Sequence, residues 1–208
     1  MGNVAPALFA GLFLGAGVYA VVQIRGSSVG GQIFWLVGLL SFAVGGLFAS
    51  LRLFFPIVEP VYVTVLLFCI SVGLGAILIG IVSHLVRPMP ERWTTIGLAI
   101  PVVVYVVAVL TDQIHFAALV QIVVLIGMTG VAAWKFEDFP RASIWVIAAA
   151  LSFALLTPLL MRVAPGLGLS QMDVGHLAMA IGLLSLVQAA KARGIGAGGA
   201  GGAGGTGA

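Results

Sequence analysis

The stretch WTTIGLAIPVVVYVVAVLTDQIHFAALVQIVVLIGMTGVAAW, residues 93–134, decides the fold class of this chain. A single helix of these 42 residues would be about 63 Å long, roughly twice the hydrocarbon thickness of a bilayer. The chain must therefore fold back within the stretch, and a polar group marks the turn: Thr111, Asp112, Gln113 and His115. We expect two membrane-spanning helices in a hairpin, the first of them kinked at Pro101.

The rest of the chain is just as apolar. Hydrophobic residues make up 62% of the 208 and charged residues 7%, and the mean hydropathy is +1.24. Soluble domains are about half apolar and a quarter charged, so this composition predicts a multi-pass protein of the cell membrane. The nine Lys and Arg residues form no basic cluster, which excludes nucleic-acid binding. The only cysteine, Cys69, excludes an intrachain disulfide.

Charges, prolines and polar clusters divide the chain into apolar segments of membrane-spanning length. Seven segments result: 4–24, 32–51, 61–85, 93–111, 114–134, 143–161 and 173–190. The predicted fold class is an all-α integral membrane protein, a seven-transmembrane-helix bundle formed by residues 1–193. Residues 194–208 are almost entirely Gly and Ala, and we expect them to form a flexible tail.

The basic residues indicate the orientation in the membrane. With seven spans, one face carries Arg25, Arg87, Arg92, Lys135, Arg141, Lys191 and Arg193, and the other carries only Arg52 and Arg162. Cytoplasmic loops are enriched in Lys and Arg, so we expect the N-terminus outside and the C-terminus inside. All four tryptophans fall near the predicted cytoplasmic ends, where we expect interfacial anchors: Trp35, Trp93, Trp134 and Trp145.

Small and polar residues within the spans predict close helix packing. Glycines recur in the first three spans, at Gly11, Gly15, Gly17, Gly38, Gly45, Gly46, Gly73, Gly75 and Gly80. Such faces let helices approach closely, and we expect packing within the chain, with homo-oligomer formation as the alternative. We expect interhelical hydrogen bonds from Gln32, Gln121 and Gln188. His84 is expected to reach the membrane interface beside Arg87.

Acidic residues, histidines and arginines occur together at the predicted outer face: Arg52, Glu59, Asp112, His115, Arg162, Asp173 and His176. Asp112 and His115 are three residues apart, as are Asp173 and His176, so each helical pair would share a face. The two pairs have the donor types for zinc, either as four ligands or as three ligands and a general base. The simpler interpretation is that both aspartates cap helices and hydrogen-bond the histidines at the membrane surface.

The positions of the lysines and histidines along the predicted spans bear on two cofactors, retinal and haem. Retinal needs a lysine near the middle of the bilayer, and both lysines, Lys135 and Lys191, lie at predicted helix ends. A retinal photoreceptor is therefore excluded. Haem b between His115 and His176 remains an alternative, because these histidines would lie at similar depth on different spans.

Two segments carry a family resemblance: LSQMDVGHLAMAIGLLSLVQAAKA, residues 169–192, and IHFAALVQIVVLIG, residues 114–127. They resemble the CREST superfamily of seven-helix membrane proteins, which holds alkaline ceramidases and adiponectin-type receptors, and most of all its bacterial branches. The resemblance implies seven spans, an N-terminus outside, and zinc bound by histidines of the second and seventh spans. His176 matches the first histidine of the seventh span.

Other positions of the family pattern differ in this chain. The second histidine of the seventh span is replaced by Ala180, and the second-span histidine by Ala49 or Ser50. The third span has no aspartate. The pattern therefore favours a non-catalytic protein without a cofactor, one that binds a lipid or small ligand or scaffolds a membrane complex. The alternative is a zinc-dependent hydrolase of lipid amides or esters, with Asp112 and Asp173 as catalytic candidates beside His115 and His176.

Overall fold

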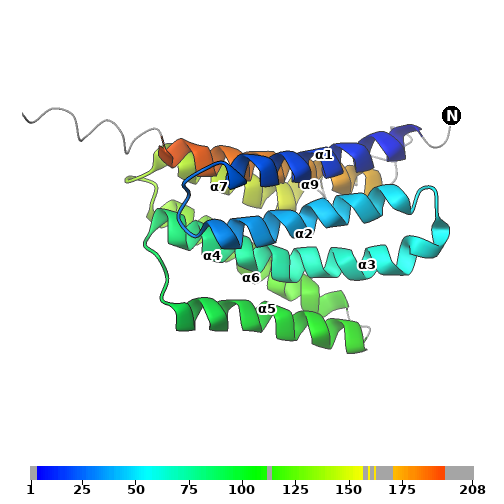
Figure 1. The fold of residues 1–208 in the computed structure, drawn as a ribbon, viewed down its shortest axis with the longest axis horizontal. Helices are drawn as coiled ribbons and strands as arrows, with labels where there is room; N and C mark the ends of the chain where they lie inside the picture. The colour runs from blue at the N-terminus through cyan, green and yellow to red at the C-terminus, as the bar shows by residue number, and fades with distance from the viewer. Residues whose placement is uncertain (1–3, 112–113, 157–158, 160–161, 163–170, 195–208) are drawn as a thin grey trace, which may run out of the picture.

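The computed structural model describes residues 4–111, 114–156, 159, 162 and 171–194, and no strand occurs among them. The helices lie side by side with their long axes roughly aligned (Figure 1). They are α1 (Val4–Arg25), α2 (Gln32–Leu51), η1 (Pro56–Val58), α3 (Glu59–Phe68), η2 (Cys69–Gly73), α4 (Leu74–Leu85), α5 (Glu91–Thr111), α6 (Ile114–Trp134), α7 (Pro140–Leu151), η3 (Ser152–Leu156) and α9 (Gln171–Gly194).

The described part of each apolar segment expected from the sequence is helical. Five described stretches are long and apolar enough to cross a membrane: Val4–Arg25, Gln32–Leu51, Pro56–Leu85, Glu91–Thr111 and Val174–Ala192. The described parts of the fifth and sixth expected spans are shorter apolar helices, Ala118–Trp134 and Pro140–Leu156. The third and sixth stretches begin earlier than expected because proline is tolerated in the first turn of a helix. The expected turn residues Asp112 and Gln113 lie outside the described residues.

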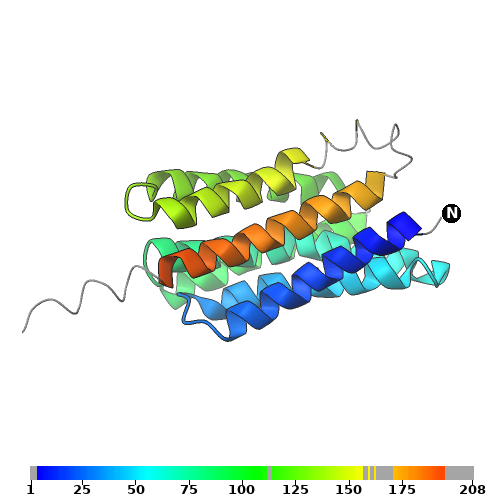
Figure 2. The same ribbon diagram turned by 90° about the horizontal axis from the view of Figure 1, so that it is seen from above.

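The bundle closes through contacts between the two ends of the chain. α1 packs against α2 and α9, and α9 packs against α7, which in turn packs against α6. Figure 2 shows α9 running between α1 and α7. α5 lies at the periphery of the bundle, where it contacts α6, α4 and η2 (Figure 1). Pro101 lies inside α5 and faces Gly75, where an added Cβ would be 2.7 Å from the proline Cγ.

Glycines bring α1 and α2 into backbone contact. A Cβ added at Gly17 would lie 2.7 Å from the Cα of Ala43, and one at Gly46 would lie 2.6 Å from the Cα of Leu14. The prediction of close packing within the chain is confirmed at these two positions. It is wrong at Gly11 and Gly15, where an added Cβ would meet nothing within 4 Å.

Two helices contain π-helical turns. The first, Cys69–Gly73, joins α3 to α4, and the second, Ser152–Leu156, continues α7. Such turns hold one extra residue and often occur at functional sites. The Cys69 thiol donates a hydrogen bond to the Ser41 carbonyl at 3.0 Å, which ties the first turn to α2. The amino-acid sequence contains no feature that predicted either turn.

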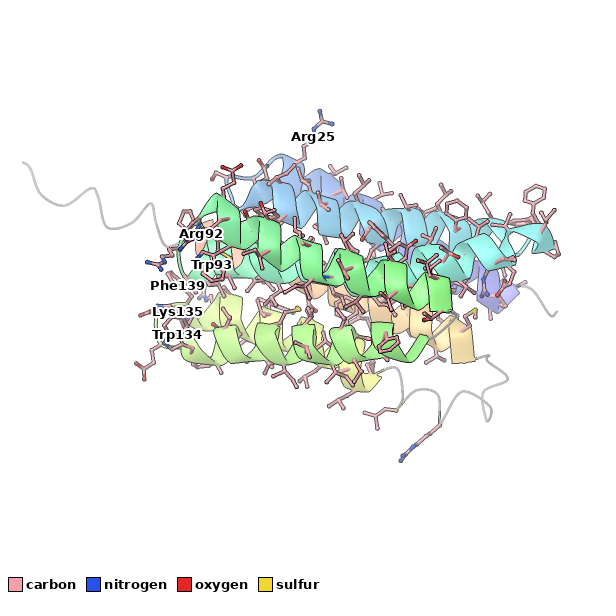
Figure 3. The ribbon with its side chains drawn as sticks, turned by 90° about the horizontal axis from the view of Figure 1, so that it is seen from below. Arg25, Arg92, Trp93, Trp134, Lys135 and Phe139 are labelled. Atoms are coloured by element: carbon pink, nitrogen blue, oxygen red, sulfur yellow. The ribbon has the colours of Figure 1, made fainter. Side chains whose placement is uncertain are left out.

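Basic and aromatic side chains gather at one end of the bundle. Figure 3 shows Arg92, Trp93, Trp134 and Lys135 at this end. The guanidinium of Arg92 lies 5.5 Å from the Trp93 ring centre, and the Lys135 ammonium lies 4.9 Å from that of Trp134. Trp35 is only 1% exposed, so the prediction that it is an interfacial anchor is wrong.

Candidate functional site

A buried histidine and tyrosine are hydrogen-bonded near the opposite end of the bundle. His176, in the second turn of α9, is 2% exposed, and Tyr62, in the first turn of α3, is 1% exposed. The His176 Nε2 atom lies 2.9 Å from the Tyr62 hydroxyl oxygen. His176 is therefore a core residue, and the prediction of a surface position for its side chain is wrong.

Three further side chains surround this pair. The Phe13 ring of α1 stacks on the imidazole, with centroids 5.5 Å apart and planes 13° from parallel. The Arg52 guanidinium lies 4.5 Å from the Tyr62 ring centre, and its Nη1 donates to both Glu59 carboxylate oxygens at 3.1 and 3.2 Å. We call these five residues the His176 cluster. They tie together four segments of the chain: α1, the end of α2, α3 and α9.

The His176 cluster contains two side chains of the types that bind metal ions, the His176 imidazole and the Glu59 carboxylate. No group of three or more His, Cys, Asp or Glu residues suited to a metal occurs in the described part of the chain. Asp112 lies outside the described residues, and only the backbone of His115 and Asp173 is described, within α6 and α9. The four residues expected around a metal are therefore not seen together, and the zinc and haem sites stay predictions.

Two members of the cluster were absent from the expected site. Tyr62 follows Glu59 by three residues and so lies on the same face of α3, at the level of Arg52. A tyrosine in an apolar helix has a polar tip that needs a partner, which was a usable signal. Phe13 had none, because it is one of 12 phenylalanines. At the positions of the resembled family's missing ligands, Ala49 is 0% and Ala180 is 5% exposed.

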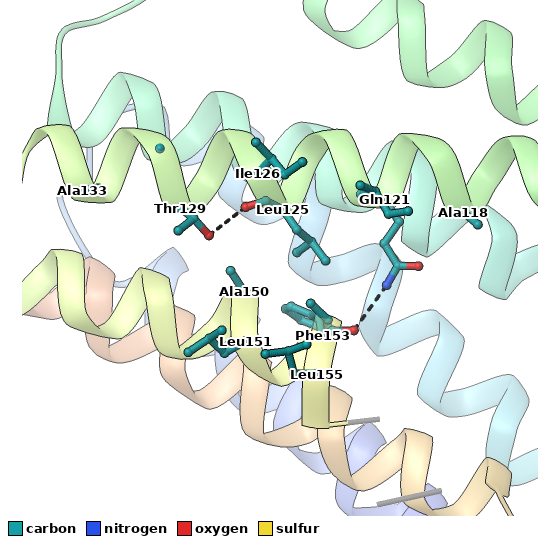
Figure 4. A pocket seen from close by; sticks show the side chains of 13 residues that line it. Ala118, Gln121, Leu125, Ile126, Thr129, Ala133, Ala150, Leu151, Phe153 and Leu155 are labelled. Atoms are coloured by element: carbon teal, nitrogen blue, oxygen red, sulfur yellow. Dashed lines mark hydrogen bonds between the residues drawn. The ribbon is translucent and has the colours of Figure 1, made fainter. Parts of the chain in front are cut away.

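A second candidate site is a groove between α6 and the helix formed by α7 and η3. Its volume is about 690 Å³. The described lining residues, none of which is charged, are Ala118, Gln121, Ile122, Leu125, Ile126, Thr129, Gly130, Ala133, Ala150, Leu151, Phe153, Ala154 and Leu155. Figure 4 shows the Gln121 carboxamide between the two helices, with its nitrogen directed at the Phe153 carbonyl. We call this space the α6–α7 groove.

The polar groups of the α6–α7 groove are neutral. Gln121 is half-buried and its Nε2 donates to the Phe153 carbonyl at 3.4 Å, which confirms the expected interhelical hydrogen bond. Thr129 donates its hydroxyl proton to the Leu125 carbonyl at 2.9 Å, so its oxygen can still accept a hydrogen bond. The groove therefore offers a mainly apolar surface with an amide and a hydroxyl.

A smaller groove runs between α1 and α9. Its volume is about 510 Å³, and its lining includes Gly11 and Gly15 of α1 and Leu177 and Ile181 of α9. An added Cβ would meet nothing within 4 Å at either of these two glycines. The described lining is apolar apart from the Tyr19 hydroxyl, and the Lys191 ammonium lies 5.7 Å from the centre of the Tyr19 ring.

His84 is the buried histidine of the opposite end. It is 5% exposed, and its Nδ1 accepts a hydrogen bond from the Gly30 N–H at 3.2 Å. Trp35 meets the imidazole edge-on, with centroids 6.3 Å apart. The prediction that His84 reaches the interface is wrong. Gly30 allows the contact, because a Cβ there would lie 2.7 Å from the Ser83 carbonyl oxygen.

A polar loop covers His84. A cavity of about 430 Å³ lies there, lined by Gly26, Ser27, Ser28, Val29, His84, Ala190 and Lys191. Gln32 closes the end of α1 by donating to the carbonyls of Ile24 at 2.8 Å, Arg25 at 3.2 Å and Ser27 at 2.9 Å. Its expected role is thus confirmed. Gln188 is exposed on α9, and no hydrogen bond of its side chain occurs among the described residues, so the expectation for it is not met.

Comparisons of the chain with protein-family models, with curated proteins and with solved structures found no match.

Proposed function

We propose that this chain is a seven-span membrane protein, with its N-terminus outside, that binds a lipid or a small apolar molecule and catalyses no reaction. The α6–α7 groove is the observation that carries the proposal. Its volume, about 690 Å³, falls in the range of roughly 300–1,000 Å³ that is usual for small-molecule sites. Its lining is apolar apart from the neutral groups of Gln121 and Thr129.

The surroundings of the groove favour binding over catalysis. Activated nucleophiles need a base within hydrogen-bond reach, and the lining residues that the structure describes include no His, Asp, Glu, Lys or Cys. The groove is also open along the side of two apolar helices, which is where a bilayer lipid would enter. A lipid carrier, a lipid-dependent scaffold of a membrane complex and a ligand-binding subunit all fit this arrangement.

Native mass spectrometry of the purified protein in a mild detergent tests the binding function. We expect a peak for the protein with one bound lipid, which persists after repeated washing with fresh detergent. Protein that carries no lipid and also takes up none from added membrane extract would contradict the proposal.

Cysteine labelling tests the proposed topology. The native Cys69 is 0% exposed and should remain unlabelled, so single cysteines can be introduced in its presence. With seven spans, a cysteine at Gln113 should label from outside intact cells and one at Glu137 only after permeabilisation. The basic residues support this orientation, seven on one face against two on the other. Labelling of both positions from the same side would contradict it.

The runner-up is a zinc-dependent hydrolase resembling the CREST superfamily. It is favoured by the burial of His176, the residue that matches a family ligand, next to the Tyr62 hydroxyl. Metal analysis of the wild type beside His176→Ala decides between the two functions. We expect no stoichiometric zinc in either protein. Zinc near one equivalent that is lost in His176→Ala would establish the hydrolase, and a haem absorption band would establish electron transfer.

A further inference from the structure

We propose that the α6–α7 groove selects neutral lipids over ionised ones, and that the Gln121 carboxamide recognises their uncharged polar group. This inference rests on the proposed lipid-binding function and names the ligand class. The occupant is an elongated apolar molecule with one hydroxyl or ester group, inserted from the bilayer between α6 and α7.

The charge of the lining supports a neutral ligand. None of the thirteen lining residues described in the structure is ionisable, and the groove lies along helices that are apolar enough to face lipid. An ionised carboxylate or phosphate in such a place lacks a charged partner, and burying an unpaired charge in an apolar medium is strongly unfavourable. A neutral hydroxyl or ester needs only one hydrogen bond, which an amide can supply.

Gln121 has hydrogen-bonding capacity left for a ligand. Its carboxamide has two N–H donors and an acceptor oxygen, and one N–H is directed at the Phe153 carbonyl. That bond is 3.4 Å long, beyond the usual 2.7–3.2 Å, so a ligand can compete for the donor. The Phe153 carbonyl belongs to the π-helical turn of η3, where the backbone hydrogen bonds are rearranged and a side chain of α6 can approach.

The depth of Gln121 sets the geometry of the ligand. Gln121 is the eighth residue of α6, so it lies about 10 Å from the start of that helix. Thr129 lies eight residues further, about 12 Å along the same groove, and Ala133 another turn beyond. Small side chains from both helices border this path, which leaves room for a hydrocarbon chain beyond the polar group: Gly130, Ala133, Ala150 and Ala154.

Oleyl alcohol and oleate are a matched pair of probes, because their hydrocarbon chains are the same and only oleate is charged at pH 9. Dissociation constants come from displacement of a fluorescent fatty alcohol bound to the full chain in a zwitterionic detergent. We expect oleyl alcohol to bind the wild type at least about tenfold more tightly than oleate.

Gly130→Leu places a leucine side chain in the α6–α7 groove. A Cβ at Gly130 meets nothing within 4 Å, so the larger side chain can enter the groove without a clash with the protein. We expect both probes to lose at least about tenfold in affinity. Gly11→Leu is the matched control, because its Cβ also meets nothing and it lies in the groove between α1 and α9. It should leave both affinities unchanged.

Gln121→Leu removes the amide and keeps an apolar side chain of similar size. We expect oleyl alcohol to bind about three- to tenfold more weakly, which is the loss of one hydrogen bond in a membrane setting. Gln121→Met provides the same change if the leucine variant does not fold. Gln188→Leu, on the exposed face of α9, is the control and should bind as the wild type does.

The outcomes distinguish the selectivity of the α6–α7 groove from the proposed lipid-binding function. If the wild type retains lipid but prefers oleate, or if Gly130→Leu binds both probes normally, the selectivity assigned to the groove is wrong and the lipid-binding function stands. An unchanged preference in both Gln121 variants overturns the role of Gln121. If the wild type binds neither probe and retains no lipid, the proposed function fails as well. A dimer that disappears in Gly130→Leu would show that a second copy occupies the groove.

Discussion

Glycines lie between α1 and α2 and also between α6 and α7, but only the first pair of helices is closely packed at them. Gly17 and Gly46 bring the backbones of α1 and α2 together, so that an added Cβ would lie within 2.7 Å of a Cα atom of the neighbouring helix. Between α6 and α7, Gly130 faces open space, and a groove of about 690 Å³ remains. At the α1–α2 interface the facing helix presents its backbone to each of these glycines, whereas at Gly130 no atom of α7 lies within 4 Å of an added Cβ.

The two helix pairs also differ in their helix type. α1 and α2 are α-helical over their full length, so their side chains repeat in register and interlock. After α7, the turn Ser152–Leu156 holds an extra residue, which shifts the register against α6. The Gln121 side chain lies at the mismatch and bonds the carbonyl of Phe153 across it.

The largest expected effect lies in the tight interface. Gly46→Val places a branched side chain against the backbone of Leu14, where even the Cβ would be 2.6 Å from the Cα. Overpacking typically costs about 1–3 kcal/mol, and contact with backbone belongs at the upper end of that range. We expect a clear fall in the midpoint of thermal unfolding in detergent, followed by intrinsic fluorescence.

Gly130→Val is the control for this prediction. The same side chain is added to a helix at a position where nothing lies within 4 Å. The two variants lose the same backbone freedom in the unfolded chain, so their difference reports the packing alone. Equal unfolding midpoints for Gly46→Val and Gly130→Val would mean that the two interfaces do not differ in the way described.

The next largest effect on stability is expected in the His176 cluster, whose side chains connect α1, the end of α2, α3 and α9. Tyr62→Phe removes the hydroxyl that lies 2.9 Å from the His176 Nε2 atom and leaves the imidazole buried. Losing one partner of a buried hydrogen bond costs about 1–3 kcal/mol. His176→Phe should cost a similar amount, because the Tyr62 hydroxyl then loses its partner.

A double-mutant cycle tests whether these two residues act together. If the hydrogen bond is the shared interaction, Tyr62→Phe combined with His176→Phe should be less destabilised than the sum of the single variants, by about 0.5 kcal/mol or more. Strict additivity of the unfolding free energies would show that Tyr62 and His176 stabilise the bundle independently.

Gln121→Leu should have a smaller effect on stability than any variant of the cluster. Its hydrogen bond to Phe153 is long, at 3.4 Å, and interhelical hydrogen bonds in membranes average about 0.6 kcal/mol. We expect the unfolding midpoint to change little while the affinity for oleyl alcohol falls. A loss of stability as large as that of Tyr62→Phe would mean that Gln121 holds α6 and α7 together rather than binding a ligand.

Much of the helix layout was predictable from the sequence, because length and hydropathy suffice to find apolar helices. The rotation of each helix was not. In a membrane helix both faces are apolar, so Trp35 and His84 were expected at the interface although both are buried. The sequence places residues along the helix axis and says little about which neighbour each one meets.

The candidate site shows the same limit. His176 was expected among the site residues, but its partner Tyr62 lies 114 positions away on another helix. No spacing rule connects residues across such a distance, because the contact depends on how α3 and α9 pack. The α6–α7 groove could not be predicted either, since it depends on how α6 packs against α7 and η3. Gln121 was the visible signal, as a polar residue in an apolar helix.

The smallest expected effect distinguishes the buried and exposed parts of the His176 cluster. Glu59 is 48% exposed and Arg52 is 11% exposed at their side chains, although the two form one ion pair. Exposed ion pairs contribute at most about 1 kcal/mol, so Glu59→Gln should lower the free energy of unfolding by less than that. Arg52→Gln should cost more, because it also removes the guanidinium that lies 4.5 Å above the Tyr62 ring. Adding 0.5 M salt should remove the Glu59→Gln effect, since screening acts on exposed charges, and should leave most of the Arg52→Gln effect. A different result would contradict this order: Glu59→Gln destabilises the protein as much as Arg52→Gln, and salt changes neither effect. The ion pair between Arg52 and Glu59 would then be the main interaction that holds α2 to α3, and the contact of Arg52 with the Tyr62 ring would contribute little.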